Sequence, residues 1–261
     1  MNIFLQFYKS LYSPKDIALF RLQGIGKTIL YVFFLTLLSI IPTVFYSGSA
    51  IVNSLNAIDE TIDTEMPDFK IEDGQLETDQ KAPVTVNKHG FAVIIDSTGT
   101  VEPAALSNSD NTIALLKNDV YIIAAGQKQS YPYSMLTSGT LTKEDLVGYM
   151  ASAESLVPAI IPLIATVIFI FSAGMRFIEI SILALVGLLF KNALRKKLEY
   201  RHLWRMSAYS ITLPAVFFAI MAALQSAVPN GAFINWFVSL IILLLAIKEV
   251  LQKDQKKTDN K

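Results

Sequence analysis

The alternation of apolar and polar stretches along the chain predicts a membrane protein. The first long apolar run, residues 29–47, contains no charged residue. A helix of about 20 such residues crosses the roughly 30 Å core of a bilayer. Pro42 lies near the far end of the run, where a kink is tolerated. The run is longer than the apolar part of a cleaved signal peptide, so we expect an uncleaved transmembrane helix.

Two further spans are predicted near the C-terminus. Residues 207–228 and 233–251 are strongly apolar, and Pro229, Asn230 and Gly231 between them are typical of a tight turn. Trp236 stands where an aromatic residue of the membrane interface is expected.

The apolar stretch at residues 156–190 has two interpretations. As one helix it would be roughly 52 Å long, too long for an upright span, and it contains Arg176 and Glu179. Dividing it into two spans would place the basic loop at residues 191–206 outside, against the usual excess of basic residues in the cytoplasm. We therefore expect one long tilted or bent span, and four transmembrane helices in all.

Charge is distributed unevenly although the formal net charge is zero. Residues 48–157 carry sixteen Asp or Glu and six Lys or Arg, whereas residues 191–206 carry one Asp or Glu and six Lys or Arg. Residues 1–28 carry one acidic and four basic residues. This asymmetry predicts cytoplasmic N- and C-termini, a cytoplasmic loop at 191–206, a cytoplasmic tail at 252–261, and an extracytoplasmic segment at 48–155.

The N-terminal segment, residues 1–28, is predicted to be amphipathic. Apolar residues recur at helical spacing along one face, and with Lys9 and Lys15 they indicate a helix lying on the cytoplasmic leaflet. A disordered leader is the alternative. The apolar positions are Ile3, Phe4, Phe7, Tyr8, Leu11 and Tyr12.

Between the first two spans we expect a small β-rich domain. The first helix should continue outward as far as Pro67. After it, apolar residues recur at every second position, as they do in β-strands. Asp73 and Gly74 predict a tight hairpin turn. Thr142 and Asp145 are placed to cap a helix over residues 141–155 that leads into the second span. Strands are predicted around Val84 and Val86 and over residues 91–95, 112–116 and 120–124.

Two short motifs resemble phosphate chemistry but fit ordinary structure better. Residues 24–28, GIGKT, end like a phosphate-binding loop, but Arg21 stands where that motif needs glycine. Residues 96–100, DSTGT, resemble a phosphorylated aspartate motif with Ser97 in place of lysine. We interpret the first as a basic junction at the membrane edge and the second as a hairpin turn after a strand.

We expect no catalytic residue, no cofactor and no metal site. The chain lacks cysteine, and His89 and His202 lie on opposite sides of the membrane in the predicted topology. The acidic residues between Asp59 and Asp79 lack the spacing of a dedicated Ca²⁺ loop, so a solvated surface is favoured. No membrane-enzyme motif is visible, and no contact with nucleic acid is expected.

Arg176 and Glu179 are the candidate functional residues. Ionisable groups inside an apolar span are unfavourable and therefore often functional. Three positions apart on a helix, they share a face and can pair. A purely structural ion pair is the alternative interpretation.

The chain resembles a family of membrane proteins from Gram-positive bacteria, domain-of-unknown-function family 1189. The resemblance is carried by FLQFYKSLYSPKDIALFRLQGIGKTILYV, PDFKIEDGQL, FAVIIDSTG and YRHLWRMSAYSITLPAVFFAI, and it covers nearly the full length. It implies a multi-pass protein of the bacterial cell membrane. Some members are named maltodextrin utilisation proteins, which implies a sugar transporter as a candidate partner besides the lipid bilayer.

Two functions remain as hypotheses. The first is a non-enzymatic accessory or sensor protein whose outer domain binds a ligand or partner. Tyr121, Tyr131 and Tyr133 are available there as aromatic platforms for sugar. The alternative is a small transporter or channel subunit that acts as an oligomer.

Overall fold

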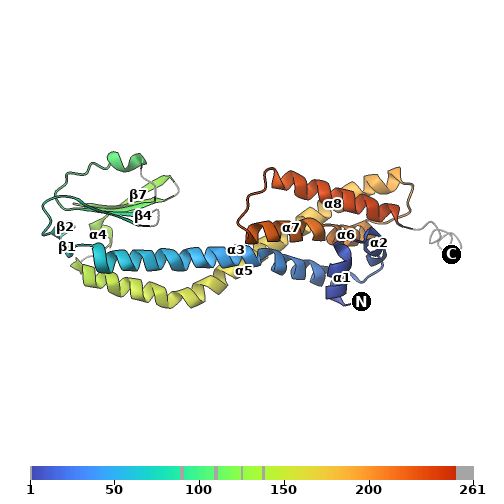
Figure 1. Ribbon diagram of the computed structural model, residues 1–261, viewed down its shortest axis with the longest axis horizontal. Coiled ribbons are helices and arrows are strands. Elements are labelled where there is room, and N and C mark those ends of the chain that lie inside the picture. The colour runs from blue at the N-terminus through green and yellow to red at the C-terminus, as the bar shows by residue number, and fades with distance from the viewer. Residues whose placement is uncertain (1, 89–90, 109–110, 125, 137–138, 251–261) are drawn as a thin grey trace. The chain divides into compact units, whose positions relative to one another are not determined.

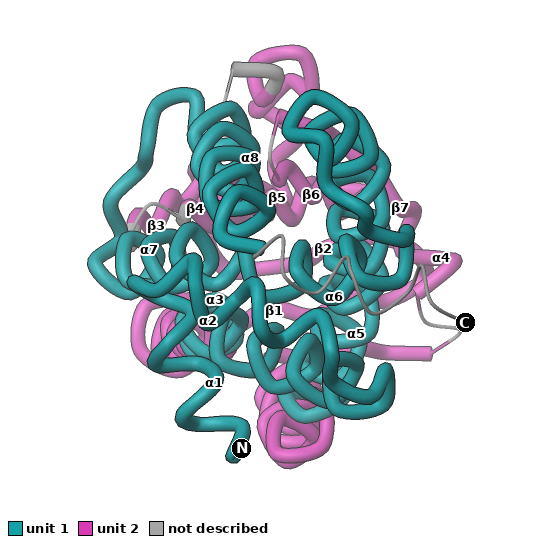
Figure 2. The backbone as a smooth tube through the Cα atoms, turned by 90° about the vertical axis from the view of Figure 1, so that its right-hand side faces the viewer, with its two compact units in different colours: residues 1–47, 161–261 teal, residues 48–160 magenta. Residues whose placement is uncertain are grey.

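The computed structural model describes residues 2–88, 91–108, 111–124, 126–136 and 139–250 (Figure 1). The chain divides into two compact units, which are coloured separately in Figure 2. Unit 1 comprises residues 1–47 and 161–261, and unit 2 comprises residues 48–160. His89 and residues 251–261, which include the predicted tail, lie outside the described residues.

Within the described residues, four helices are long and apolar enough to cross a membrane, as the sequence predicts. The first contains α3 (Ile25–Glu60) and ends in a π-helical turn, η1 (Thr61–Glu65), just before Pro67. The second is α5 (Lys143–Ala193). The third is formed by α6 (Tyr200–Ser210) with α7 (Thr212–Ala223), and the fourth is α8 (Gly231–Lys248). These spans indicate a multi-pass membrane protein.

The second span is one continuous helix of 51 residues, so the interpretation as two separate spans does not hold. The third differs from the prediction at its start. Residues 200–206 belong to α6 rather than to a basic loop. Leu203 and Met206 are fully buried there, and burying these two side chains on one face is what extends the helix toward the N-terminus.

The N-terminal segment forms two short helices, α1 (Ile3–Ser10) and α2 (Pro14–Phe20). Asn2 caps the first, and Ser13 caps the second with Pro14 in its first turn. The predicted helix is therefore present, and a disordered leader is not. The buried side chains of α1 are the polar Gln6 and Ser10, whereas Phe4 and Tyr8 of α1, and Tyr12 just after it, are exposed.

The described residues of unit 2 form two small sheets. The three-stranded sheet has the order β2-β1-β8, formed by β1 (Phe69–Glu72), β2 (Gln75–Thr78) and β8 (Leu141–Thr142). The five-stranded sheet has the order β3-β4-β5-β6-β7. Its strands are β3 (Val84–Lys88), β4 (Phe91–Asp96), β5 (Thr112–Leu116), β6 (Asp119–Ala124) and β7 (Gln127–Pro132).

The predicted hairpin of unit 2 is confirmed. Asp73 and Gly74 both have positive φ, 51° and 76°, as a tight two-residue hairpin turn requires. Strand β8 precedes α5, so that helix begins at Lys143 rather than at Leu141. The predicted cap is present, because Thr142 and Asp145 bond each other's backbone N–H groups at 2.9 and 3.3 Å.

The connection after β4 differs from the prediction. Strands β4 and β5 are parallel, so residues 96–100 cannot form a hairpin between them. A parallel pair needs a crossover of about a dozen residues or more, and the connection between these two strands contains the 3₁₀ helix η2 (Ala105–Asn108). The short helix α4 (Tyr133–Leu136) follows β7.

The five-stranded sheet supplies the core of unit 2. One of its faces contributes Val93, Ile95 and Leu115 to a buried cluster that also contains Ile62 of η1. Side chains of α3 and α5 pack against this cluster, among them Ile58 and Met150. The parts of both long helices that belong to unit 2 therefore serve as the support on which the sheet packs.

Candidate functional site

Arg176 and Glu179 lie on α5 and form an ion pair. Arg176 Nη1 donates to Glu179 Oε2 at 3.0 Å. Their side chains are only 18% and 12% exposed, so neither charge is freely solvated within the chain. Removing either partner would leave the other charge in an apolar environment, which is strongly unfavourable.

A third residue completes this polar group. Asn235 of α8 donates from Nδ2 to Glu179 Oε1 at 2.6 Å. Both oxygens of the carboxylate therefore have partners, one on the same helix and one on another span. Asn235 has no motif around it, and only its position in an otherwise apolar span could have drawn attention to it.

The same turns of α5 also contact the remaining spans. Phe177 packs edge-on against Phe33 of α3, with ring centroids 5.5 Å apart. It also stacks on Trp204 of α6, with centroids 6.3 Å apart. Trp204 Nε1 donates to Ser181 Oγ at 3.2 Å. We call residues Arg176, Phe177, Glu179 and Ser181 of α5 the junction, because α3, α6 and α8 all meet α5 there.

Close packing of α5 continues beyond the junction at Gly187. A Cβ added to this residue would stand 3.3 Å from a methyl group of Leu203 and 3.4 Å from one of Leu243. The lack of a side chain thus lets α5 approach α6 and α8 closely, as small residues do at helix contacts in membranes. The junction and this contact together attach α5 to the rest of unit 1.

Unit 2 contains a cleft of about 790 Å³ between α3 and the five-stranded sheet. Ile113 of β5 and Ile122 of β6 contribute apolar surface to it, and Asn53, Asn56 and Glu60 of α3 contribute polar surface. A volume of this size with a mixed lining fits a small organic ligand. The sequence pattern does not reveal the cleft, because the residues on its two sides, at 53–60 and 111–124, lie far apart in the sequence.

The comparison with protein families decides the identity of the chain. Residues 4–247 match the family described as protein of unknown function, DUF1189. The chain belongs to this family. The match includes the junction and the cleft, and the description of the family assigns no activity to either. Comparisons with curated proteins and with solved structures give no match.

A second buried polar cluster ties the N-terminal helices of this DUF1189 protein to its third span. The Tyr209 hydroxyl of α6 donates its one hydrogen to Gln6 Oε1 of α1 at 2.8 Å, and Gln23 Oε1 lies 3.3 Å from the same hydroxyl oxygen. The hydroxyls of Tyr31 and Thr212 lie 2.6 Å apart. The bond from Tyr209 accounts for the burial of the polar Gln6, which lies on α1 beside Ile3 and Phe7, two apolar residues that also pack against the core.

The two phosphate-like motifs of the DUF1189 chain have structural roles. Gly24 directly precedes α3, residues 25–28 form its first turn, and Thr28 is fully buried. Asp96 is buried at the end of β4 and accepts hydrogen bonds from Thr98 and from the backbone N–H of Val101. Burial by itself raises the pKa of Asp96, but the hydrogen bonds from Thr98, Val101 and Gly99 outweigh it and lower the pKa below its ordinary value.

Across the described residues, no group of three or more His, Asp or Glu side chains is placed to hold a metal ion. His202 bonds the backbone N–H of Glu199 in the first turn of α6. Tyr133 is not a platform, because it is buried and donates to Leu116 O at 2.7 Å, and this burial raises its pKa. Tyr131 is exposed, whereas Tyr121 is partly buried, and the Lys128 ammonium lies 4.9 Å from the centre of its ring.

Proposed function

We propose that this DUF1189 protein is a non-enzymatic sensor or accessory protein of the bacterial cell membrane. Unit 2 receives a ligand or partner outside the cell, and the junction transmits the resulting change to the rest of unit 1. No catalytic step is part of the proposal. The described residues that form the junction and line the cleft include no histidine, and the chain has no cysteine.

The observation that carries the proposal is the continuity of α3 and α5. Each helix contributes residues to both units, and neither is interrupted at residues 47–48 or 160–161. In unit 2 both helices support the sheet, and in unit 1 they meet each other through Phe33 and Phe177. A change in the spacing of the two helices in unit 2 would therefore act on residues that contact every other span.

The orientation in the membrane rests on charge. Basic residues are concentrated in residues 1–28 and 191–206, and acidic residues predominate in unit 2. Basic loops remain in the cytoplasm, so we place the ends of the chain inside and unit 2 outside. A sugar transporter is the partner we propose, on the basis of the names of some family members, and copurification in mild detergent tests it.

Tryptophan fluorescence gives a direct test of transmission. The chain has two tryptophans, Trp204 and Trp236, and both belong to unit 1. In a Trp236→Phe background the emission reports only on Trp204, which stacks on Phe177 of the junction. Ala153→Phe would then enlarge a side chain that lines the groove between α3 and α5 in unit 2. Overpacking of this kind displaces neighbouring elements.

The expected result is a shift in the Trp204 emission of full-length protein in lipid nanodiscs. Ala151→Phe is the matched control, because Ala151 is an exposed residue of the same helix that does not line the groove. It should leave the emission unchanged. Identical spectra for the two variants, both folded, would overturn the proposed transmission.

A further inference from the structure

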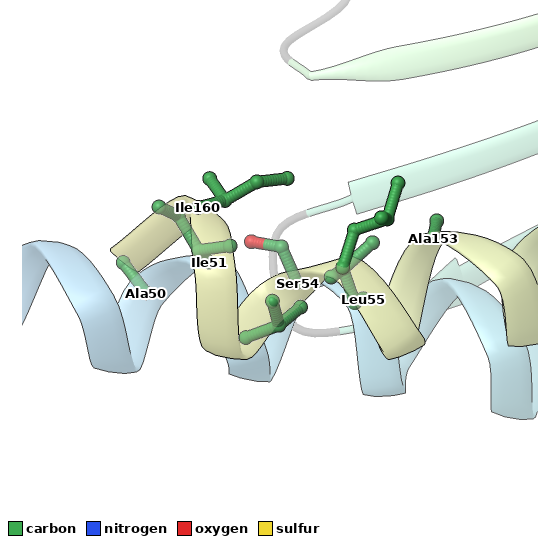
Figure 3. Close-up of a pocket in the computed structure, with 8 residues that line it drawn as sticks. Ala50, Ile51, Ser54, Leu55, Ala153 and Ile160 are labelled. Atoms are coloured by element: carbon green, nitrogen blue, oxygen red, sulfur yellow. The ribbon is translucent and has the colours of Figure 1, made fainter. Parts of the chain in front are cut away.

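Two hollows of unit 2 adjoin one another. The first is the cleft under the sheet, and the second is a groove of about 480 Å³ between the outer parts of α3 and α5 (Figure 3). Ser54 of α3 lines both. The two hollows therefore share this residue of their walls, and an elongated ligand that passes Ser54 would occupy both.

The groove has an apolar lining. Ile51 and Leu55 face it from α3, and Leu156, Val157 and Ile160 face it from α5. Leu156 is 55% exposed, so the groove is accessible from the side. In water this much exposed aliphatic surface would be unfavourable, and an apolar chain in the groove would remove it from solvent.

The position of the groove favours a lipid as the source of that chain. Residues 156–160 form the outer end of the apolar stretch that predicts the second span. The same helix continues with exposed Leu163, Val167 and Ile170, which is the surface that a membrane helix presents to acyl chains. The groove is thus a continuation of the lipid-facing surface of α5.

The cleft supplies the complementary polar half. Its wall carries the amides of Asn53 and Asn56, and Glu60 adds a negative charge. Such groups bond hydroxyl and amine donors. None of the described residues that line either hollow is basic, and unit 2 has sixteen acidic and six basic residues. A phosphate headgroup would therefore meet repulsion, whereas an uncharged headgroup with hydroxyls would not.

We infer that unit 2 binds a neutral, hydroxyl-bearing glycerolipid of the outer leaflet. One acyl chain lies in the groove, and the headgroup reaches past Ser54 into the cleft. The inference rests on the proposed function in one respect: it identifies the chemical class of the ligand that unit 2 receives. Binding itself does not require that the signal reach the junction.

Native mass spectrometry of the full-length protein tests the inference. Delipidated protein in mild detergent is titrated with monoglucosyl dioleoylglycerol, and separately with dioleoylphosphatidylglycerol, which has the same acyl chains. We expect one retained molecule of the neutral lipid, and retention of the anionic lipid weaker by about tenfold or more. Equal retention of the two lipids, or no retained neutral lipid, would overturn the inference.

Groove-filling variants locate the bound lipid. Ala153→Phe should weaken retention of the neutral lipid by about tenfold or more, because the new ring occupies the acyl-chain volume. Ala151→Phe should leave retention unchanged. If Ala153→Phe fails to fold, Ala50→Phe fills the same groove from α3 and gives the same expected loss. Retention at the wild-type level in a folded groove-filling variant would place the lipid elsewhere and contradict the inference.

The two proposals fail separately. Loss of lipid retention in Ala153→Phe with no change in Trp204 emission would uphold the lipid site and overturn transmission. A change in emission with no lipid retained by the wild-type protein would uphold transmission and overturn the lipid site.

Discussion

Asn235 on α8 donates a 2.6 Å hydrogen bond to Glu179 on α5, and this bond joins two spans at a charged side chain. Glu179 also accepts from Arg176. The carboxylate therefore compensates a cation on its own helix while it holds a second helix in register. Arg176 and Glu179 are predictable from the sequence as a pair. Only the contact with Asn235 shows that the pair connects α5 to α8.

The first prediction concerns the charge on Glu179. Glu179→Gln leaves Arg176 without its counter-ion in an apolar environment, and the loss of one partner of a buried pair destabilises a protein by about 3–5 kcal/mol. A pair exposed to water would contribute only about 0–1 kcal/mol. We expect Glu179→Gln to lower the yield of monodisperse protein in detergent markedly.

The double variant Arg176→Leu with Glu179→Leu is the control for this prediction. Replacing both charges by apolar residues is often nearly neutral, so it should restore much of the yield. If Glu179→Gln purifies as well as the wild-type protein, then Arg176 and Glu179 do not depend on each other as a buried ion pair. A double variant that folds but cannot replace the wild-type gene in cells would show a role beyond stability.

The second prediction compares two glycines of α5. Gly187→Leu inserts a side chain where Leu203 and Leu243 already approach within 3.3 and 3.4 Å of a Cβ position. Overpacking of this kind costs about 1–3 kcal/mol, so the melting temperature should fall. A Cβ added at Gly174 would have no atom within 4 Å. Gly174→Leu should therefore leave the melting temperature close to that of the wild-type protein. Equal effects of both changes would argue against close packing at Gly187.

The third prediction concerns the buried carboxylate of Asp96. Its folded-state pKa is lowered, because hydrogen bonds outweigh the opposing effect of burial. The pKa of an aspartate in the unfolded chain is about 3.9. Because the pKa of Asp96 is lower in the folded protein, its ionised carboxylate stabilises the fold at every pH above that value. This stability is lost as the pH falls through the pKa of the folded state. Asp96→Asn should therefore reduce the stability of unit 2 at neutral pH by about 1–3 kcal/mol.

Hydrogen exchange of the β4 and β5 amides in the full-length protein measures this effect. The difference between the wild-type protein and Asp96→Asn should shrink as the pH is lowered below about 4. Glu102→Gln changes an exposed carboxylate nearby and should alter stability by less than about 0.5 kcal/mol. A difference for Asp96→Asn that is the same at every pH would show that the charge is not what stabilises the turn.

Much of the fold is predictable from local signals. Four apolar runs, the Asp73-Gly74 turn and the Thr142–Asp145 cap each depend on residues close together in sequence, and each is present in the structure. Strand β7 was not predicted, because QKQSYP has no apolar alternation and its residues are mostly exposed. It is held in the sheet by pairing with β6, which propensity does not reveal.

The candidate site is less predictable because it depends on distant residues. Asn235 is 56 positions from Glu179, and Gln6 is 203 positions from Tyr209. No periodicity in either segment relates these side chains. The parallel pairing of β4 with β5 was missed for the same reason, since a turn-like sequence after β4 is equally compatible with a hairpin and with a crossover.

The most direct test of the account is the location of unit 2, because the sensor and the lipid site both require it to be outside the cell. The chain has no cysteine, so single cysteines can be placed at Gln127 on β7 and at Asn192 near the end of α5, both exposed. The account predicts that a membrane-impermeant maleimide labels Gln127→Cys in intact cells and labels Asn192→Cys only after lysis. Labelling of Asn192→Cys in intact cells, or protection of Gln127→Cys until lysis, would contradict it.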